Sequence, residues 1–146
     1  MQLPRFLSCL VMCGLLGCGN SEPPVVPVNG IVTLKDKPLE GAVVRFFPHG
    51  NTPGHGGEGV TGAHGKFEIT AARTKSKGLP IGTYKIVITC LRRPDGSIPA
   101  SGVPDIESDA REVVPEPYSS RRDTPLIATV DADGKTHDFH LPLKKK

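Results

Sequence analysis

Two pairs of arginines lie at the base of a long proline-rich segment, residues 91–124, one pair near each end. Loops of this length without regular structure are usually functional or disordered. If the strands on either side are neighbours, four guanidinium groups meet at one end of the fold, where they could bind phosphate or carboxylate. The sequence therefore predicts a candidate anion- or partner-binding site at Arg92, Arg93, Arg121 and Arg122. The alternative is local neutralisation by acidic residues of the same segment, Asp105, Glu107, Asp109, Glu112 and Glu116.

A glycine-rich loop carries the histidines that could bind metal. His49, His55 and His64 lie in or near it, together with Glu58. Imidazole and carboxylate are ligands for zinc or copper, but this spacing matches no compact ligand motif. A flexible loop would also lose much conformational entropy in bringing them together. We therefore expect solvated histidines, with no metal and no cofactor; a metal-binding or hydrolytic use of the loop is the alternative function.

Other reaction chemistry is missing from the sequence. It contains no phosphate-binding loop, no paired-carboxylate motif and no nucleophile elbow, so we expect a protein that is not an enzyme. Cys90 ends an apolar segment without a marked histidine partner, which predicts a small buried side chain. The formal net charge is only +3 and no basic stripe is interleaved with aromatics, so we expect no nucleic-acid partner.

The amino-terminal segment has the pattern of a secretory signal. Residues 6–16 are apolar and follow Arg5. The run is shorter than the roughly 20 residues that cross a bilayer, but it fits the hydrophobic region of a signal peptide. It ends in Leu-Leu-Gly-Cys at residues 15–18, which resembles the lipobox of bacterial lipoproteins. That resemblance implies cleavage before Cys18 and attachment of a diacylglyceryl group to its thiol.

A polar, proline-containing stretch follows the cysteine. Residues 19–27 contain three prolines and little apolar bulk, which predicts a semi-extended spacer of about 25–30 Å. Such a spacer would hold the folded domain away from the membrane surface. The acyl chains on Cys18 would anchor the protein firmly in that membrane. Gly19, by resemblance to lipoprotein sorting rules, implies the outer membrane rather than the inner one.

Alternation of apolar and polar residues, typical of half-buried strands, recurs along the rest of the chain. Turn residues bound each segment, and no helical pattern is long enough for a crossover between parallel strands. The predicted fold is all-β, a single antiparallel seven-stranded Greek-key β-sandwich. The strands fall in residues 28–34, 41–48, 60–69 (a hairpin turning at 63–65), 83–90, 125–130 and 135–141.

These segments also carry a family resemblance. VNGIVTLKDKPLEGAVVRFFP at residues 28–48, GVTGAHGKFEI at 59–69 and GLPIGTYKIVI at 78–88 resemble the carboxypeptidase-regulatory-like, or transthyretin-like, β-sandwich domain. The closing segments VVPEPYSS, TPLIATV and HDFHL are similar to those of a group of small bacterial lipoproteins built on this domain. Hydroxyisourate hydrolases of this architecture end in Tyr-Arg-Gly-Ser, which this chain lacks, so the resemblance implies a fold and no activity.

The predicted organisation has four parts: a signal peptide over 1–17, the lipidated Cys18 with a linker over 18–27, the sandwich over 28–143 and a basic tail over 144–146. The expected function is a non-catalytic module anchored in the cell envelope. Its lipid would hold it to a membrane, which is the outer one by the sorting rule, while the sandwich meets an envelope protein or glycan.

Overall fold

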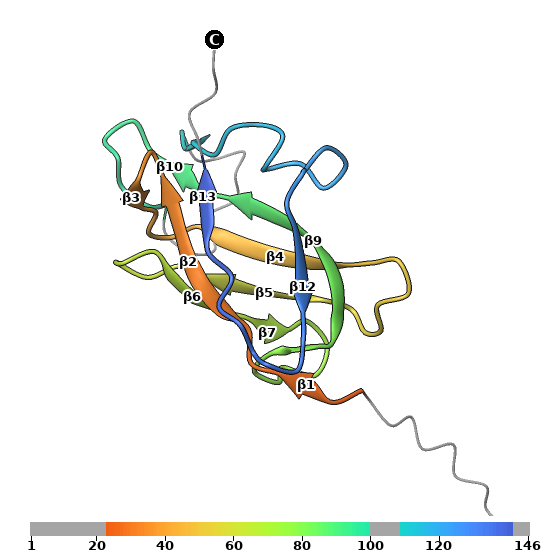
Figure 1. Cartoon of the computed structure of the whole chain (residues 1–146). Coiled ribbons are helices and arrows are strands. Elements are labelled where there is room, and N and C mark those ends of the chain that lie inside the picture. The colour runs from red at the N-terminus through yellow and green to blue at the C-terminus, as the bar shows by residue number, and fades with distance from the viewer. Residues whose placement is uncertain (1–22, 100–108, 142–146) are drawn as a thin grey trace, which may run out of the picture.

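The computed structural model describes residues 23–99 and 109–141; the predictions for Cys18, the signal peptide and the basic tail lie outside these residues. The described chain forms strands and no helix (Figure 1). Seven strands have three or more residues: β2 (Asn29–Leu34), β4 (Val43–His49), β5 (Gly57–Val60), β6 (Lys66–Glu68), β9 (Gly82–Thr89), β12 (Ile127–Val130) and β13 (Phe139–Leu141). Six are two-residue strands: β1 (Val25–Val26), β3 (Lys37–Pro38), β7 (Thr70–Ala71), β8 (Leu79–Pro80), β10 (Leu91–Arg92) and β11 (Arg111–Glu112).

Two sheets make up the body of the fold. The larger has the order β12-β9-β4-β5-β7, and the smaller has the order β13-β2-β3 with β6 also paired to β2. All pairs in both are antiparallel except β13–β2, which is parallel with Phe139 opposite Val32. The prediction of an all-β, sandwich-like fold is confirmed, with this one parallel pair as the difference. Residues 23–99 and 109–141 hold no helix of the length and apolarity that crossing a bilayer requires.

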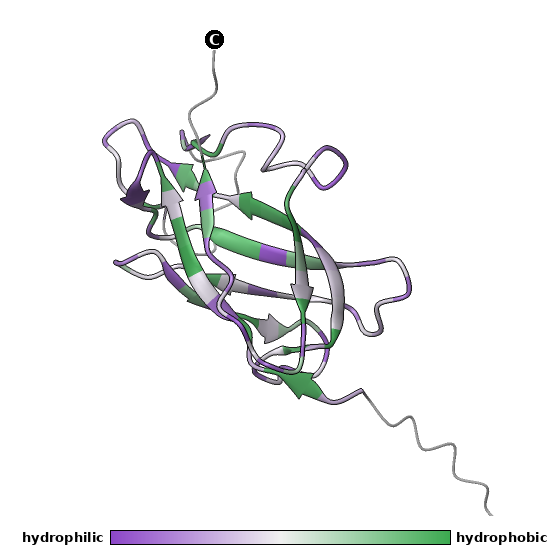
Figure 2. Ribbon diagram, viewed as in Figure 1, coloured by the Kyte–Doolittle hydropathy of each residue, from purple (hydrophilic) through white to green (hydrophobic). Residues whose placement is uncertain are grey.

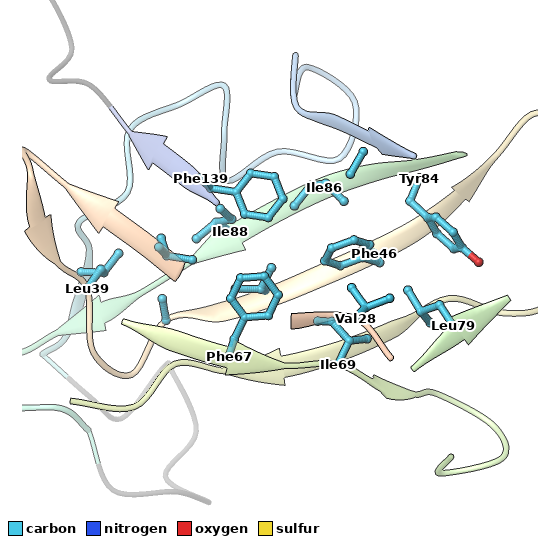
Figure 3. Close-up of a cluster of buried hydrophobic side chains, with 14 of the residues drawn as sticks. Val28, Leu39, Phe46, Phe67, Ile69, Leu79, Tyr84, Ile86, Ile88 and Phe139 are labelled. Carbon is cyan, nitrogen blue, oxygen red and sulfur yellow. The ribbon is translucent and has the colours of Figure 1, made fainter. Parts of the chain in front are cut away.

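The core lies between the sheets and follows the predicted alternation. Tyr84, Ile86 and Ile88 of β9 are all fully buried, and their neighbour Phe46 of β4 lies at the centre of an aromatic cluster (Figure 3). The Phe46 ring centroid is 5.9 Å from that of Tyr84, 6.4 Å from that of Phe67 and 6.3 Å from that of Phe139. The pairs with Tyr84 and Phe139 are edge-to-face, an arrangement that adds about 0.5–1.5 kcal/mol per pair beyond simple burial. Figure 2 shows the apolar residues concentrated on the strands and the polar ones in the connecting loops.

The predicted hairpin over residues 60–69 is split between the two sheets. Its ends keep hairpin register, since Glu58 pairs with Thr70 and the Gly62 N–H donates to the Lys66 carbonyl at 2.9 Å. Between them, β6 leaves β5 and pairs with β2 of the other sheet. This places the Phe67 side chain in the core and gives the edge of β2 a partner. Alternation along one segment cannot reveal that choice of partner.

The boundary predicted at residue 28 is too late. Val25 and Val26 form β1, which pairs with β8 through Val25–Pro80 and Val26–Leu79, and Val26 packs against the core. These two valines are the only bulky apolar residues in the predicted spacer, so pairing with β8 removes apolar surface from water. The folded body therefore begins at β1.

Candidate functional site

A short ladder between β10 and β11 organises the region of the first arginine pair. In it Leu91 lies opposite Glu112 and Arg92 lies opposite Arg111. Two residues on each side are too few to hold such a ladder by themselves. A side chain completes it: Glu112 Oε1 accepts hydrogen bonds from the backbone N–H groups of Cys90 and Val114, each at 2.8 Å. The carboxylate thus fastens the returning chain to the end of β9.

Ionisation in this region is shifted by loss of hydration. Burial raises the pKa of the Glu112 carboxyl, and the backbone N–H groups that it accepts from act in the opposite direction. Burial also raises the pKa of the Cys90 thiol, against the lowering effect of Arg92. A thiol that stays protonated is a poor nucleophile. Cys90 is buried in the core, as the sequence predicts.

A cavity of about 320 Å³ opens beside the ladder, lined by Arg92, Arg93, Pro94, Arg111 and Val113. The guanidinium of Arg92 is held in place, because its Nη2 donates to the Glu40 carbonyl oxygen. Its Nη1 is buried and has no hydrogen-bond acceptor within the described residues. Arg93 Nε lies 3.7 Å from Asp109 Oδ1, a long ion pair, and Arg111 is exposed.

The second arginine pair lies elsewhere. The Arg121 guanidinium stacks over the Phe47 ring, 4.3 Å from its centroid, and Arg122 Nε pairs with Asp123 Oδ1 at 3.2 Å. Phe47 lies near the end of β4, whereas Arg92 packs against Gly41, before that strand begins. The length of β4 from Val43 to Phe47 therefore separates the two sites, about 13 Å.

The structure thus does not bring the four predicted arginines together. After β11 the chain runs back along β9, with the Ile88 N–H donating to the Tyr118 carbonyl at 3.0 Å and the Ile86 N–H to the Leu126 carbonyl at 2.9 Å. That return carries residues 121 and 122 away from residues 92 and 93. The third arginine of the cavity is Arg111, which sequence reasoning missed because a two-residue strand inside a loop leaves no periodic signal.

The histidines are spread over the surface and the edge of the core. His55 Nε2 lies 3.3 Å from Arg73 Nη1, and Glu58 pairs with Arg45 at 3.1 Å instead of with a histidine. His49 and His64 are exposed. Within residues 23–99 and 109–141, no three His, Cys, Asp or Glu side chains gather closely enough to hold a metal ion.

His137, just before β13, and His140 within it point in opposite directions. The His137 ring lies 6.1 Å from that of Phe46 at the edge of the core, whereas the exposed His140 Nδ1 is 2.8 Å from Thr33 Oγ1. Burial lowers the pKa of His137, and the charges of Asp131 and Asp138 oppose that shift. The two rings therefore do not form a shared site.

Comparison with known proteins supplies no family name for this arrangement. No protein-family model, no curated protein and no solved structure matches the chain. The function assigned to the chain must accordingly rest on its residues and on the geometry described above.

Proposed function

We propose that this chain is a lipid-anchored, non-catalytic module of a bacterial cell envelope, which presents a β-sandwich to a protein or glycan. The observation that carries the proposal is Leu-Leu-Gly-Cys at residues 15–18, at the end of an apolar run and shortly before the first strand of the fold. In this proposal the Cys18 thiol takes the diacylglyceryl group. The body is a β-sandwich of the carboxypeptidase-regulatory-like kind, and the protein is anchored in the outer membrane.

The position of β1 supports such an anchor. Val25 is paired with Pro80, so the folded body starts only seven residues after Cys18. Seven residues of fully extended chain reach at most about 25 Å. A protein anchored in this way stays close to the membrane surface, with the end that contains β1 and β8 nearest to it.

The opposite end of the sandwich would then face outward. β1 pairs with β8, which directly precedes β9, whereas β10 follows the far end of β9 (Figure 1). The eight residues of β9 span about 25 Å. The length of the sandwich therefore separates the arginine-lined cavity beside β10 and β11 from the anchored end. A partner outside the membrane could reach the cavity there.

Processing of the full chain in a Gram-negative bacterium tests the proposal. The wild-type protein is expected in the membrane fraction, with a mature amino terminus at Cys18 whose mass includes acyl chains. The variant Cys18→Ser should accumulate as an unprocessed precursor without lipid. The variants Cys9→Ser and Cys13→Ser are matched controls, because both cysteines lie within the apolar run and should leave processing unchanged. A wild-type amino terminus free of acyl groups would refute the anchor.

A further inference from the structure

Arg92 and Arg111 are directly opposite each other in the β10–β11 ladder, an arrangement that needs an explanation. Residues directly opposite in an antiparallel pair point to the same face, and like charges in such a pair destabilise it. Arg93 adds a third cation at the same cavity. A ladder of two residues has little stability with which to offset this repulsion.

The acidic groups of the described chain neutralise these cations only in part. Asp109 is 3.7 Å from Arg93, which leaves a loose pair. Glu112 belongs to the same ladder, but its Oε1 already accepts two backbone N–H groups. Among residues 23–99 and 109–141, Arg92 Nη1 is a buried donor without an acceptor. A buried donor without an acceptor is destabilising, which adds to the cost of the like-charge pair.

The Arg92 side chain is also held in a fixed orientation. Its Nη2 donates to the Glu40 carbonyl, and its Nη1 lies against Gly41, where a Cβ atom would come within 3.3 Å of it. Gly41 has a φ of 69°, which favours glycine and lets the backbone approach the guanidinium closely. A donor group that is already oriented loses less entropy when it binds a ligand.

The cavity limits the kind of ligand. Its volume of about 320 Å³ is near the lower end of the range for small-molecule sites. The surface of the cavity is mostly apolar. Of the arginines that line it, Arg93 is partly exposed and Arg111 is exposed, and guanidinium groups favour an oxyanion, which they can bind through paired hydrogen bonds. Pro94 and Val113 offer apolar surface beside them. A ring-sized unit that carries one carboxylate or phosphate fits this combination better than an extended peptide.

We propose that Arg92, Arg93 and Arg111 form a binding site for the carboxylate or phosphate group of an acidic sugar, at the end of the sandwich away from β1. Such a site would make an acidic glycan the partner of the envelope module proposed above. It rests on that proposed function only for the direction in which the cavity faces, because binding itself does not need the lipid.

Titration of the full mature chain in non-ionic detergent tests the site. The probes are glucuronate for a carboxylate, glucose 6-phosphate for a phosphate and glucose as the neutral control, all at constant ionic strength. Binding is followed by calorimetry. Saturable binding of at least one acidic sugar is expected, with no binding of glucose. Comparison of the two acidic probes shows which oxyanion the site prefers.

Single substitutions locate the binding. Arg111→Gln should weaken it about tenfold, and because Arg111 is exposed this variant is expected to fold. Arg92→Gln should weaken it at least as much, with a circular dichroism spectrum recorded to show that the sandwich persists. Arg73→Gln is the matched control, since this exposed arginine lies beside His55 and outside the cavity.

Three outcomes would overturn the proposal. The first is no saturable binding of either acidic sugar, which would mean that carboxylates of the chain itself neutralise the cluster. The second is an equal loss in Arg73→Gln and Arg111→Gln, which would show attraction to net charge only. The third is binding of triglutamate in preference to both sugars, which would indicate an acidic peptide. If Cys18 carries no lipid but the cavity binds, the anchor is refuted and the site stands.

Discussion

The Tyr84 hydroxyl donates a 2.7 Å hydrogen bond to the Pro80 carbonyl oxygen, and both residues are buried. The Tyr84 ring packs against Phe46 in the centre of the core, while Pro80 pairs with Val25 of the first strand. This single bond therefore links the aromatic core to the strand that receives the amino-terminal segment. Burial raises the pKa of Tyr84 to about 12.

Tyr84→Phe should lower the free energy of unfolding by about 1–2 kcal/mol, because it leaves the buried Pro80 carbonyl without its donor. Urea denaturation at neutral pH measures the loss. The control is Tyr118→Phe, where the half-buried ring is kept and a change within about 0.5 kcal/mol is expected. Equal losses in both variants would contradict the role given to the Tyr84 hydroxyl.

Alkaline pH offers a second measurement on the same residue. The folded pKa of about 12 lies above the ordinary value of 10.0, so between these values the unfolded chain has lost the proton that the folded chain keeps. Stability should therefore fall as pH rises from 10 towards 12. In Tyr84→Phe that part of the pH dependence should be absent.

Gly30→Ala should destabilise the fold by about 3 kcal/mol or more. A Cβ at Gly30 would lie 1.8 Å from the His137 carbonyl oxygen, and this backbone is itself held by the bond from the His137 N–H to the Asn29 carbonyl at 2.9 Å. Neither chain can move aside without breaking the contact between β2 and the segment that leads to β13. Urea denaturation checks the result.

Gly62→Ala is the matched control for that substitution. Apart from its chain neighbours, no heavy atom of the described residues would lie within 4 Å of a Cβ at Gly62. A change within about 0.5 kcal/mol is expected. If Gly62→Ala were as damaging as Gly30→Ala, the loss would come from the backbone freedom of glycine in general and not from the close approach at His137.

Sequence alternation predicted the strands but not their partners. The inward positions Tyr84, Ile86 and Ile88 are buried as expected, because burial on one face imposes a period of two. Contacts between distant segments leave no such mark. Nothing in residues 28–34 indicates that Gly30 must admit the His137 backbone, and nothing in residues 60–69 indicates that β6 joins the other sheet.

The sequence predicted that arginines would form the candidate site, but not which arginines. Arg92 and Arg93 line the cavity, as their place at the base of the long loop suggested. Arg121 instead stacks on Phe47, and Arg111 takes its place. That exchange depends on the register of a two-residue ladder, which is set by hydrogen bonds to the Glu112 side chain. Such side-chain-to-backbone contacts cannot be read from residue spacing.

His137 should make stability depend on pH in the mildly acidic range. Its folded pKa is lowered from 6.5, mainly because burial disfavours the charged ring. As pH falls below 6.5 the unfolded chain binds a proton that the folded chain resists, so the free energy of unfolding should decrease. Denaturation at several pH values between 5 and 7.5 would show this slope.

Two asparagine variants assign that slope to one ring. His137→Asn should flatten it, although the variant also loses packing against Phe46 and starts from a lower stability. His140→Asn should keep the wild-type slope, since His140 is exposed and contacts only Thr33 among the hydrogen-bond partners of the described chain. A slope that disappears in His140→Asn and persists in His137→Asn would reverse the assignment.

Substitution of Glu112 tests whether the β10–β11 ladder positions Arg92 and Arg111. Glu112→Ala removes the acceptor shared by the Cys90 and Val114 N–H groups, so the β10–β11 pairing should loosen and Arg111 should no longer be held opposite Arg92. The expected result is a loss of about 1–3 kcal/mol in stability together with weaker binding of the acidic sugar. Calorimetric titration and urea denaturation measure the two effects on the same protein.

Glu112→Gln separates position from charge. Its amide oxygen can still accept both N–H groups, and it avoids the unfavourable burial of charge that raises the pKa of the Glu112 carboxyl. This variant should therefore keep the wild-type stability and bind acidic sugar at least as tightly, because one negative charge beside the cavity is gone. If Glu112→Gln bound as weakly as Glu112→Ala, the carboxylate would act through its charge, and the ladder would not be what positions Arg92 and Arg111.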